Sequence, residues 1–308
     1  MGSAERKGEG MTQVTLMDGS IGHELIKRSG NRAMPLRSTQ VMIDQPDLVG
    51  AVHSDYFAMG ATIATTNTYA VHHSQLEQIG LEDQVPALID TAVAQAETAR
   101  ANYTGGRIAG SLGPLLASYR LDLNPDPDEA AVKFGELVNL MKPRVDLFLI
   151  ETVSSVQEAT GALRGTKGCG KPVWLALSVM DRDGTRLRSG EALSDIAPLI
   201  AEYAPEAVLI NCTRPESVPA ALEIIKGFGL PFGAYANGFT HISEKYLADD
   251  PTVDTLEPRS DLGPDAYATQ AMGWVGQGAT IVGGCCEVGP DHIAELARRL
   301  REAGHEIV

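Results

Sequence analysis

Three of the chain's four cysteines follow apolar runs that have the composition of β-strands. Cys212 comes directly after the run at 207–211, and the adjacent Cys285 and Cys286 follow the run at 280–283. Thiolates are soft ligands that select Zn²⁺ over Mg²⁺ or Ca²⁺. Three thiolates around one zinc ion leave an open position, where an incoming thiol can be held as a nucleophile at neutral pH. The pattern therefore indicates a zinc centre for alkyl transfer to sulfur.

The alternative is that Cys212 is a small buried hydrophobe and that the cysteine pair has no role. Gly283 and Gly284 precede the pair, and we expect them to permit the sharp backbone turn that two adjacent ligands require. Cys169 lies in the loop Lys167-Gly168-Cys169-Gly170 and does not follow an apolar run, so we expect it to take no part.

The rest of the chain alternates short apolar runs with longer helix-periodic segments. The runs are apolar on both faces, which is typical of parallel strands covered by helices. Eight strands are predicted, at 14–18, 61–66, 107–111, 146–151, 173–179, 207–211, 232–236 and 280–283. With helices between them and no linker, they favour a single (βα)8 TIM barrel with parallel strands; an open Rossmann-type sheet is the alternative.

In such a barrel the strand ends that carry the cysteines open onto one mouth. Strands two places apart direct side chains into the same layer, so Cys212 on strand six can meet the pair on strand eight. Two long connections, 113–127 and 239–262, follow strands at that same end, where active-site lids are built. Surface decoration is an equally good interpretation of the second connection.

The composition and net charge limit the kinds of molecule that this protein can bind. The 308 residues carry a formal charge of −15 without a basic cluster, which excludes nucleic acid and anionic membranes as partners.

The polar residues 1–12 are predicted to be a disordered tail or an expression remnant, and 13–308 to be the barrel domain. No apolar run reaches the roughly 20 residues of a membrane span, so we expect a cytoplasmic protein with reduced cysteines. The sequence is compatible with a homo-oligomer.

Motifs at seven predicted strand ends resemble those of the homocysteine S-methyltransferase family. This family includes betaine–homocysteine and S-methylmethionine–homocysteine methyltransferases and the homocysteine domain of methionine synthase. The matching segments are Met17-Asp18-Gly19-Ser20, Thr66-Asn67-Thr68-Tyr69, Gly110-Ser111-Leu112-Gly113-Pro114, Glu151-Thr152, Asn211-Cys212, Asn237-Gly238 and Gly283-Gly284-Cys285-Cys286. The pairing of Asn-Cys with Gly-Gly-Cys-Cys is the most specific of these. The family fold is a (βα)8 barrel, in agreement with the strand pattern.

The resemblance implies that Cys212, Cys285 and Cys286 bind zinc. It also implies that Asp18 and Glu151 bind the amino group of homocysteine, while main-chain amides near Gly19 bind its carboxylate. A zwitterionic amino acid needs anionic groups at its ammonium end, so these assignments are chemically sensible. Without the resemblance, Asp18 reads equally well as a turn residue and Glu151 as a member of a structural ion pair.

Three further assignments concern the fourth metal position and the methyl donor. Asn237 resembles a family asparagine whose carbonyl oxygen would occupy zinc's fourth position in the absence of substrate; an ordinary Asn-Gly turn is the alternative. Tyr69 resembles an aromatic residue next to the donor methyl group, where its ring would attract an onium ion; simple packing under a loop is the alternative. Arg37 stands where many relatives have tryptophan. It would clamp a donor carboxylate, or lie solvated in its loop.

The sequence thus predicts a zinc-dependent S-methyltransferase that moves a methyl group from an onium donor, S-methylmethionine or betaine-like, to homocysteine to give methionine. A second interpretation keeps the zinc but changes the partner: another small thiol or selenol as acceptor, or a methyl-corrinoid protein as donor. A third, of a different class, is a non-catalytic barrel that senses zinc or oxidant. No histidine pair has metal-ligand spacing, and no Rossmann or Walker phosphate loop is evident.

Overall fold

The computed structural model describes residues 12–30, 36–242 and 256–308. Of the predicted N-terminal tail, residues 1–11 lie outside this description. In the described part, nine strands form one parallel sheet in the order β11-β1-β10-β9-β8-β5-β4-β3-β2. Their bounds are β1 Gln13–Leu16, β2 Ile63–Thr65, β3 Arg107–Leu112, β4 Leu147–Val153, β5 Val173–Leu177, β8 Ala207–Asn211, β9 Phe232–Tyr235, β10 Ile281–Val282 and β11 Glu306–Ile307. Each of the eight predicted strands therefore exists.

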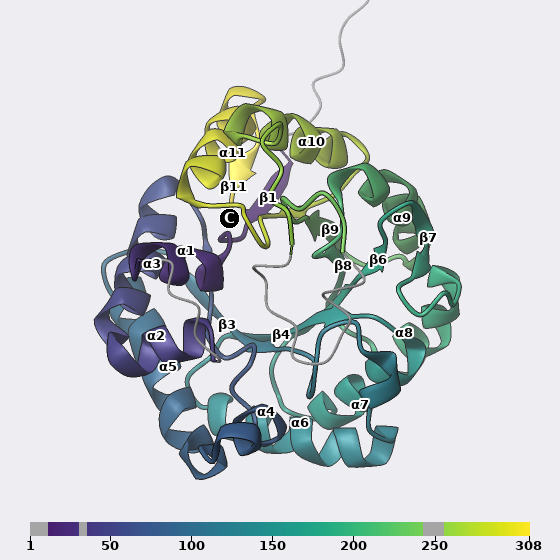
Figure 1. The fold of residues 1–308 in the computed structure, drawn as a ribbon. Helices are drawn as coiled ribbons and strands as arrows, with labels where there is room; N and C mark the ends of the chain where they lie inside the picture. The colour runs from purple at the N-terminus through teal and green to yellow at the C-terminus, as the bar shows by residue number, and fades with distance from the viewer. Residues whose placement is uncertain (1–11, 31–35, 243–255) are drawn as a thin grey trace, which may run out of the picture.

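Helices surround the strands as a ring (Figure 1). They are α1 Ile21–Arg28, α2 Ser38–Asp44, α3 Pro46–Met59, α4 His73–Leu76, α5 Val85–Arg100, α6 Pro127–Met141, α7 Val156–Thr166, α8 Ala197–Tyr203, α9 Val218–Ile225, α10 Pro264–Gly276 and α11 Pro290–Glu302. No helix in the described ranges is both long enough and apolar enough to cross a membrane. The arrangement is α/β and of the TIM-barrel type.

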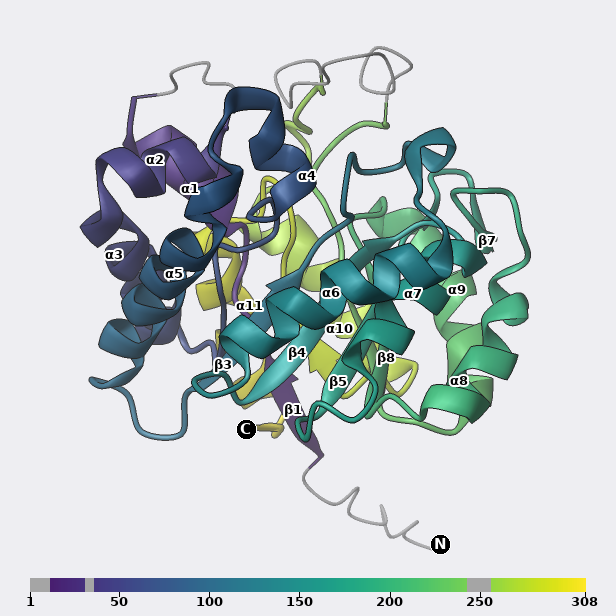
Figure 2. The ribbon, with the colours of Figure 1, turned by 90° about the horizontal axis from the view of Figure 1, so that it is seen from below.

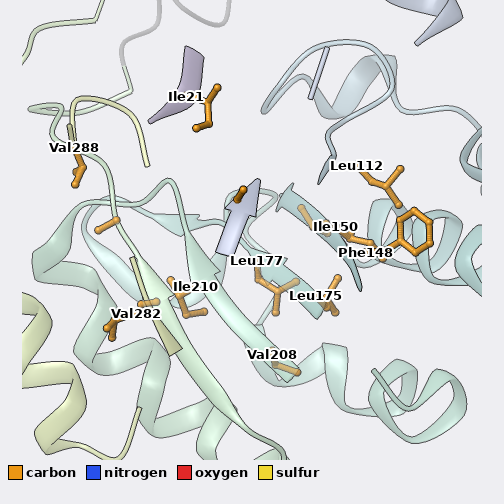
Figure 3. Packing of buried hydrophobic residues seen from close by; sticks show 14 of the residues in the cluster. Ile21, Leu112, Phe148, Ile150, Leu175, Leu177, Val208, Ile210, Val282 and Val288 are labelled. Atoms are coloured by element: carbon orange, nitrogen blue, oxygen red, sulfur yellow. The ribbon is translucent and has the colours of Figure 1, made fainter. Parts of the chain in front are cut away.

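Alternate residues of the central strands enter two separate cores, which explains why these strands are apolar on both faces. One set packs outward against the helices (Figure 3): Phe148, Ile150, Leu175, Leu177, Val208 and Ile210. The other set packs inside the sheet: Leu147, Leu149, Trp174, Ala176, Ala207 and Leu209. Inward-facing residues that lie beyond the last apolar layer of a strand face the barrel mouth. Glu151 on β4 is one of them, two residues beyond Leu149.

The sheet is not closed by a continuous ladder. Gln13 and Val14 at the start of β1 pair with β11, so the last strand occupies the part of β1's edge that β2 would otherwise use. One backbone hydrogen bond crosses this gap: Thr62 N, just before β2, donates to Leu16 O at the end of β1 at 2.7 Å. The (βα)8 prediction therefore holds for strand order and direction, while strand β11 and the incomplete seam were not foreseen.

A two-stranded antiparallel hairpin is the other unpredicted element. The predicted fifth strand, 173–179, ends in the structure at Leu177, and the chain then forms β6 (Val179–Met180) and β7 (Asp183–Leu187). The apolar run misled the prediction because Val179 belongs to the hairpin and is buried there. The hairpin lies at the carboxyl end of β5, beside the mouth (Figure 2).

The structure describes one of the two long predicted connections completely and the other only in part. The connection 113–127 is fully described and contains one turn of 3₁₀ helix, Leu121–Leu123. Within the connection 239–262, residues 243–255 lie outside the described part. The C-terminus lies at the opposite end of the barrel from the mouth, because β11 pairs with the first residues of β1 (Figure 2).

Candidate metal and substrate site

The three cysteines at the ends of β8 and β10 converge. The Sγ atoms of Cys212 and Cys286 are 3.8 Å apart and those of Cys285 and Cys286 are 4.0 Å apart. All three sulfurs lie within 4.8 Å of one another. In a tetrahedral site with Zn–S bonds of about 2.3 Å, sulfur atoms are separated by about 3.8 Å. The donor set and its spacing therefore fit a zinc ion bound by three thiolates.

The end of β9 holds both cysteine segments in place. Cys212 donates its N–H to Tyr235 O at 3.2 Å, and Cys285 donates its N–H to Ala236 O at 2.9 Å. β9 lies between β8 and β10 in the sheet. The carbonyl groups of its last residue, Tyr235, and of the next residue, Ala236, therefore fix Cys212 and Cys285, which are 73 positions apart in sequence. Strand order, which the sequence does not display directly, thus determines the geometry of the cluster.

The double glycine has a different purpose from the predicted one. Neither Gly283 nor Gly284 has left-handed backbone angles. A Cβ atom on Gly283 would lie 2.6 Å from the Met17 Cβ, and one on Gly284 would lie 2.2 Å from a Val288 methyl carbon. Gly283 therefore permits close packing of the β10 end against the β1 end, and Gly284 permits close approach of Val288, which follows the cysteine pair. The positive φ angles at the cluster belong to Cys212 and to another residue, Glu287.

The cluster favours one thiolate in the absence of metal. Hydrogen bonds from the Cys285 and Cys286 thiols lower the pKa of Cys212 well below its ordinary value. The hydrogen bond with Cys212 raises the pKa of each of the other two thiols. A negative charge on Cys212 is thus stabilised by its neighbours, as expected of sulfur atoms that share a small volume.

Asn237 lies against the cluster with its amide nitrogen toward sulfur. Its Nδ2 is 3.9 Å from Cys212 Sγ, and its Oδ1 accepts a hydrogen bond from Phe239 N at 3.2 Å. To present the carbonyl oxygen to a metal, the amide would have to rotate and give up the bond from Phe239. The residue is buried, so its position next to the cluster is fixed by the fold.

Asp18 follows β1 and reaches across to β2. Its two carboxylate oxygens accept hydrogen bonds from the backbone N–H and the hydroxyl of Thr65, at 2.6 and 2.8 Å. Burial raises the pKa of Asp18 to about 7, although the bonds from Thr65 oppose the shift. The alternative of a simple turn residue does not describe this carboxylate, which joins two strands.

Glu151 at the end of β4 is held by two hydroxyl groups. Its oxygens accept hydrogen bonds from Ser111 Oγ at 2.5 Å and from Tyr235 OH at 3.1 Å. Burial raises the pKa of Glu151 to about 7, and the two hydroxyl donors oppose the shift. Both hydrogen bonds to this carboxylate come from neutral hydroxyl groups and not from a cation, so a structural ion pair does not describe it. A buried acid of this kind has capacity to bind an ammonium group.

Gly19 lies where the chain passes from β1 into helix α1. A Cβ atom there would lie 2.2 Å from the Val288 carbonyl oxygen and 2.9 Å from the Tyr56 ring, so a side chain is excluded. Ser20 caps α1 by accepting the His23 N–H on its side chain. The first-turn amides of a helix attract anions, so an anionic group near Gly19 would meet them.

The two predicted donor residues lie on segments that contact each other. Tyr69, half-buried after β2, shares a hydrogen bond with Ser118 Oγ at 2.7 Å. Arg37, with φ of 50°, directly precedes α2. The backbone of the next residue, Ser38, accepts a hydrogen bond from Asn67 Nδ2 at 3.2 Å, which ties the Arg37 segment to the loop that carries Tyr69.

Sequence reasoning missed the polar residues behind Cys212. The carbonyl oxygen of Cys212 accepts hydrogen bonds from Tyr119 OH, Ser178 Oγ and Arg188 Nη2, at 3.2, 3.4 and 3.3 Å. Arg188 comes from the end of the β6–β7 hairpin. The turn of this hairpin lies at Asp181 and Arg182, and Asp183 and Gly184 begin β7. Aspartate and glycine clustered at 181–184 are a common turn signal, and weighing them would have separated the hairpin from the preceding strand.

Comparison with known proteins gives a consistent family match. The family model described as homocysteine S-methyltransferase matches residues 15–300. A homocysteine S-methyltransferase of Escherichia coli is 29% identical over 304 residues, which covers 93% of this chain and 95% of the relative. The Bacillus subtilis protein YbgG, named a homocysteine S-methyltransferase, is 28% identical, with 92% of this chain and 93% of the relative covered. A Brassica oleracea selenocysteine Se-methyltransferase is 25% identical, with 92% and 88% covered.

Solved structures agree in fold over nearly the whole chain. The metallated form of the E. coli homocysteine methyltransferase MmuM superposes with a TM-score of 0.77 at 28% identity, covering 93% of this chain and 96% of that one. The apo form of the same enzyme gives a TM-score of 0.70 at 27% identity, with 93% and 95% covered.

Proposed function

We propose, from the premise that the chain belongs to the homocysteine S-methyltransferase family, that it transfers a methyl group from an onium donor to homocysteine and releases methionine. It is a methyltransferase that acts on small molecules. The observation that carries the mechanism is the convergence of three sulfur atoms within 4.8 Å, at the same mouth as two buried carboxyl groups.

We propose that Cys212, Cys285 and Cys286 hold a Zn²⁺ ion, because three soft donors at tetrahedral spacing suit this metal. Zinc would supply a Lewis-acid centre that keeps the homocysteine sulfur in its nucleophilic thiolate form. Asn237 would occupy the remaining position when no substrate is bound. It would act through its carbonyl oxygen after rotation of the amide.

The chain's acidic residues would orient the amino acid. Asp18 and Glu151 offer buried carboxylates to the ammonium group, and the first-turn amides beyond Gly19 offer donors to the carboxylate. Together these contacts fix both ends of homocysteine, so that its sulfur points in one direction. Such alignment alone can contribute on the order of 7–11 kcal/mol to lowering a bimolecular barrier.

The donor would enter from the side of Tyr69 and Arg37. The ring of Tyr69 can attract a sulfonium or quaternary ammonium through its π face, while Arg37 can bind a donor carboxylate, as on S-methylmethionine. The homocysteine sulfur forms a bond to the methyl carbon as the bond to the donor's sulfur or nitrogen breaks. The electron pair of that bond stays on the leaving atom, which departs neutral, so no general acid is needed.

Metal analysis combined with a donor panel tests this function. Purified protein should contain about one zinc per chain, as the tetrahedral site requires, and should form methionine from homocysteine. S-Methylmethionine, betaine, other sulfonium donors and S-adenosylmethionine are compared at equal concentration. Turnover at the full rate by protein freed of metal would contradict the proposal.

A second candidate is methyl transfer to another small thiol or to a selenol. It is favoured by the 25% identity to a selenocysteine Se-methyltransferase over 92% of this chain. Selenium in the acceptor position would use the same three cysteines and the same carboxylates. Competition between homocysteine and selenocysteine for one donor, read as the ratio of kcat/KM values, distinguishes the two acceptors.

The remaining alternatives differ in what the assay would yield. A methyl-corrinoid protein as donor predicts no turnover with the onium panel and turnover when the methylated corrinoid protein is added. A non-catalytic sensor of zinc or oxidant predicts tight zinc binding without turnover under any of these conditions. The paired carboxyl groups of Asp18 and Glu151 beside the cysteines favour an enzyme over the sensor.

We propose that residues 13–308 form a single homocysteine-binding domain and that the barrel is a complete (βα)8 barrel, whose seam between β1 and β2 is joined by Thr62, Asp18 and Thr65 instead of a ladder. The four cysteines are free thiols, which suits the proposed cytoplasmic location. Light scattering would decide the oligomeric state.

A further inference from the structure

We propose that Tyr119 and Arg188 are positioning residues that fix the orientation of Cys212 and so set the affinity and geometry of the metal centre. This inference rests on the metal site of the proposed function. It also gives a role to two elements: the connection 113–127, and the β6–β7 hairpin, which the sequence did not predict.

The carbonyl oxygen of Cys212 accepts three hydrogen bonds. Tyr119 OH, Arg188 Nη2 and Ser178 Oγ all donate to it, at 3.2, 3.3 and 3.4 Å. A carbonyl oxygen has two lone pairs, so three donors from three different segments saturate it. Metal ligands in proteins are commonly held by hydrogen bonds to groups outside the coordination sphere, and loss of such a bond typically weakens metal binding 10- to 100-fold.

Cys212 needs this support because its backbone is strained. Its φ is 46°, in the left-handed region that is unfavourable for any residue with a Cβ atom. A change of this conformation would rotate the Cα–Cβ bond and carry Sγ away from the other two sulfurs. The bonds to the carbonyl oxygen, together with the N–H bond to Tyr235 O, hold the residue on both sides of its Cα atom.

Arg188 is itself fixed rather than mobile. Its Nη2 donates to Asp181 Oδ1 at 2.8 Å and its Nε donates to Ser178 Oγ at 2.9 Å. Its guanidinium carbon lies 4.5 Å from the centre of the Tyr119 ring. The side chains of Arg188 and Asp181 are only 10% and 13% exposed. A buried guanidinium with this many fixed contacts presents Nη2 to Cys212 in one orientation.

Tyr119 connects the metal side of the mouth to the donor side. It lies in the connection 113–127 with a φ of 68°, a second strained residue. The preceding residue, Ser118, shares a hydrogen bond with the OH of Tyr69 at 2.7 Å. Consecutive residues of this connection therefore contact the proposed donor residue and the carbonyl of a proposed metal ligand. The connection sets the separation between donor and thiolate.

The experiment uses two conservative variants, Tyr119→Phe and Arg188→Lys. Tyr119→Phe removes one hydroxyl and keeps the ring under Arg188. Arg188→Lys keeps the positive charge beside Asp181 but removes the planar guanidinium group with its several N–H donors. Matched controls are Tyr203→Phe on helix α8 and Arg186→Lys, which lies in the same hairpin with its side chain 53% exposed. Metal affinity is measured by competition with a chromophoric chelator, and the Co²⁺-substituted proteins are compared by thiolate-to-metal absorption.

We expect both variants to bind zinc about 10- to 100-fold more weakly than wild type and to show shifted Co²⁺ absorption, while the controls match wild type. The melting temperature of each metal-free variant serves as a check on folding. If Arg188→Lys does not fold, Tyr119→Phe decides alone. Unchanged affinity and unchanged Co²⁺ absorption in folded variants would overturn the inference. A wild-type protein that binds no metal through its cysteines would instead overturn the proposed function.

Discussion

Asp18 binds Thr65 through both oxygens of its carboxylate, at 2.6 Å to the backbone N–H and 2.8 Å to the hydroxyl. The bond joins the ends of β1 and β2, at the seam where the sheet has no continuous ladder. The carboxylate therefore accepts a backbone N–H that a neighbouring strand would normally pair. The same residue is the proposed partner of the substrate ammonium, so Asp18 has both a structural and a binding role.

Substitutions at Asp18 and Thr65 should separate these roles. Asp18→Asn keeps an acceptor for the Thr65 N–H but removes the negative charge, so we expect a large rise in the KM for homocysteine and little change in stability. Thr65→Val keeps the charge and removes one hydroxyl, so we expect a loss of about 1 kcal/mol in the free energy of unfolding and a nearly unchanged KM. Urea denaturation and steady-state kinetics measure both quantities.

The harsher change, Asp18→Ala, serves as the reference for these two variants. It leaves the buried N–H of Thr65 unpaired, which should cost about 1–3 kcal/mol, and it also removes the ammonium partner. If Asp18→Asn binds homocysteine as well as wild type does, the carboxylate is structural only.

Removal of one sulfur should abolish activity. Cys212→Ala leaves two thiolates, too few for a three-sulfur zinc site, so we expect loss of stoichiometric zinc and of methionine formation. Prolonged treatment with a chelator should have the same effect on wild type, and added zinc should reverse it. Cys169→Ala is the matched control, since Cys169 lies in the loop after α7, where its Sγ is 3.5 Å from Lys171 O. A Cys212→Ala protein that retains wild-type turnover would refute the assignment.

Binding of the amino-acid product should depend on pH near neutrality. Methionine carries the same ammonium group as homocysteine but has no thiol to titrate. The pKa of Glu151 and that of Asp18 are each raised to about 7 by burial. An ammonium group binds the ionised carboxylate, so affinity should rise with pH and fall on acidification below 7. From the ionised fractions, we expect roughly a tenfold difference between pH 6 and pH 8 for each carboxyl involved.

Isothermal titration with methionine from pH 5.5 to pH 8.5 measures this dependence. Glu151→Gln is the control, because an amide at this position cannot ionise. Its affinity should be weaker throughout and should show a shallower slope. An affinity for methionine that does not vary across this range would show that neither carboxyl group binds the ammonium in its ionised form.

The donor assignment is tested through Arg37. With a donor that carries a carboxylate, such as S-methylmethionine, Arg37→Ala should raise the donor KM and leave the homocysteine KM unchanged. With a donor that lacks a carboxylate, the substitution should have no such effect. Arg186→Ala in the β6–β7 hairpin is a control for the loss of one positive charge. An unchanged donor KM in Arg37→Ala would remove Arg37 from the donor site.

Much of the fold could be predicted because its signals are local. Runs such as 146–151 are apolar on both faces, and this pattern has few interpretations other than a parallel strand covered by helices. The hairpin at 179–187 was missed because only Ser178 separates Val179 from the apolar run of β5, so Val179 was assigned to that strand. Strand β11 has two residues, which is too short to produce a pattern.

The candidate site was predictable in part for the same reason. Cysteines at strand ends, with acids at the ends of other strands, mark one mouth as soon as a parallel barrel is assumed. The network of Tyr119, Ser178 and Arg188 was not predictable, because each residue is ordinary in its own segment. Its significance arises only where three segments meet at one carbonyl oxygen.

The sequence by itself determined which elements form and which chemistry the strand ends can perform, since both depend on residue type and on short-range periodicity. Only the tertiary structure decided how near the three sulfurs come, that Asp18 joins two strands, and that Gly283 and Gly284 allow close approach instead of a turn. These features depend on distances between segments far apart in the chain. Such distances are set by strand order and packing, which no local pattern records.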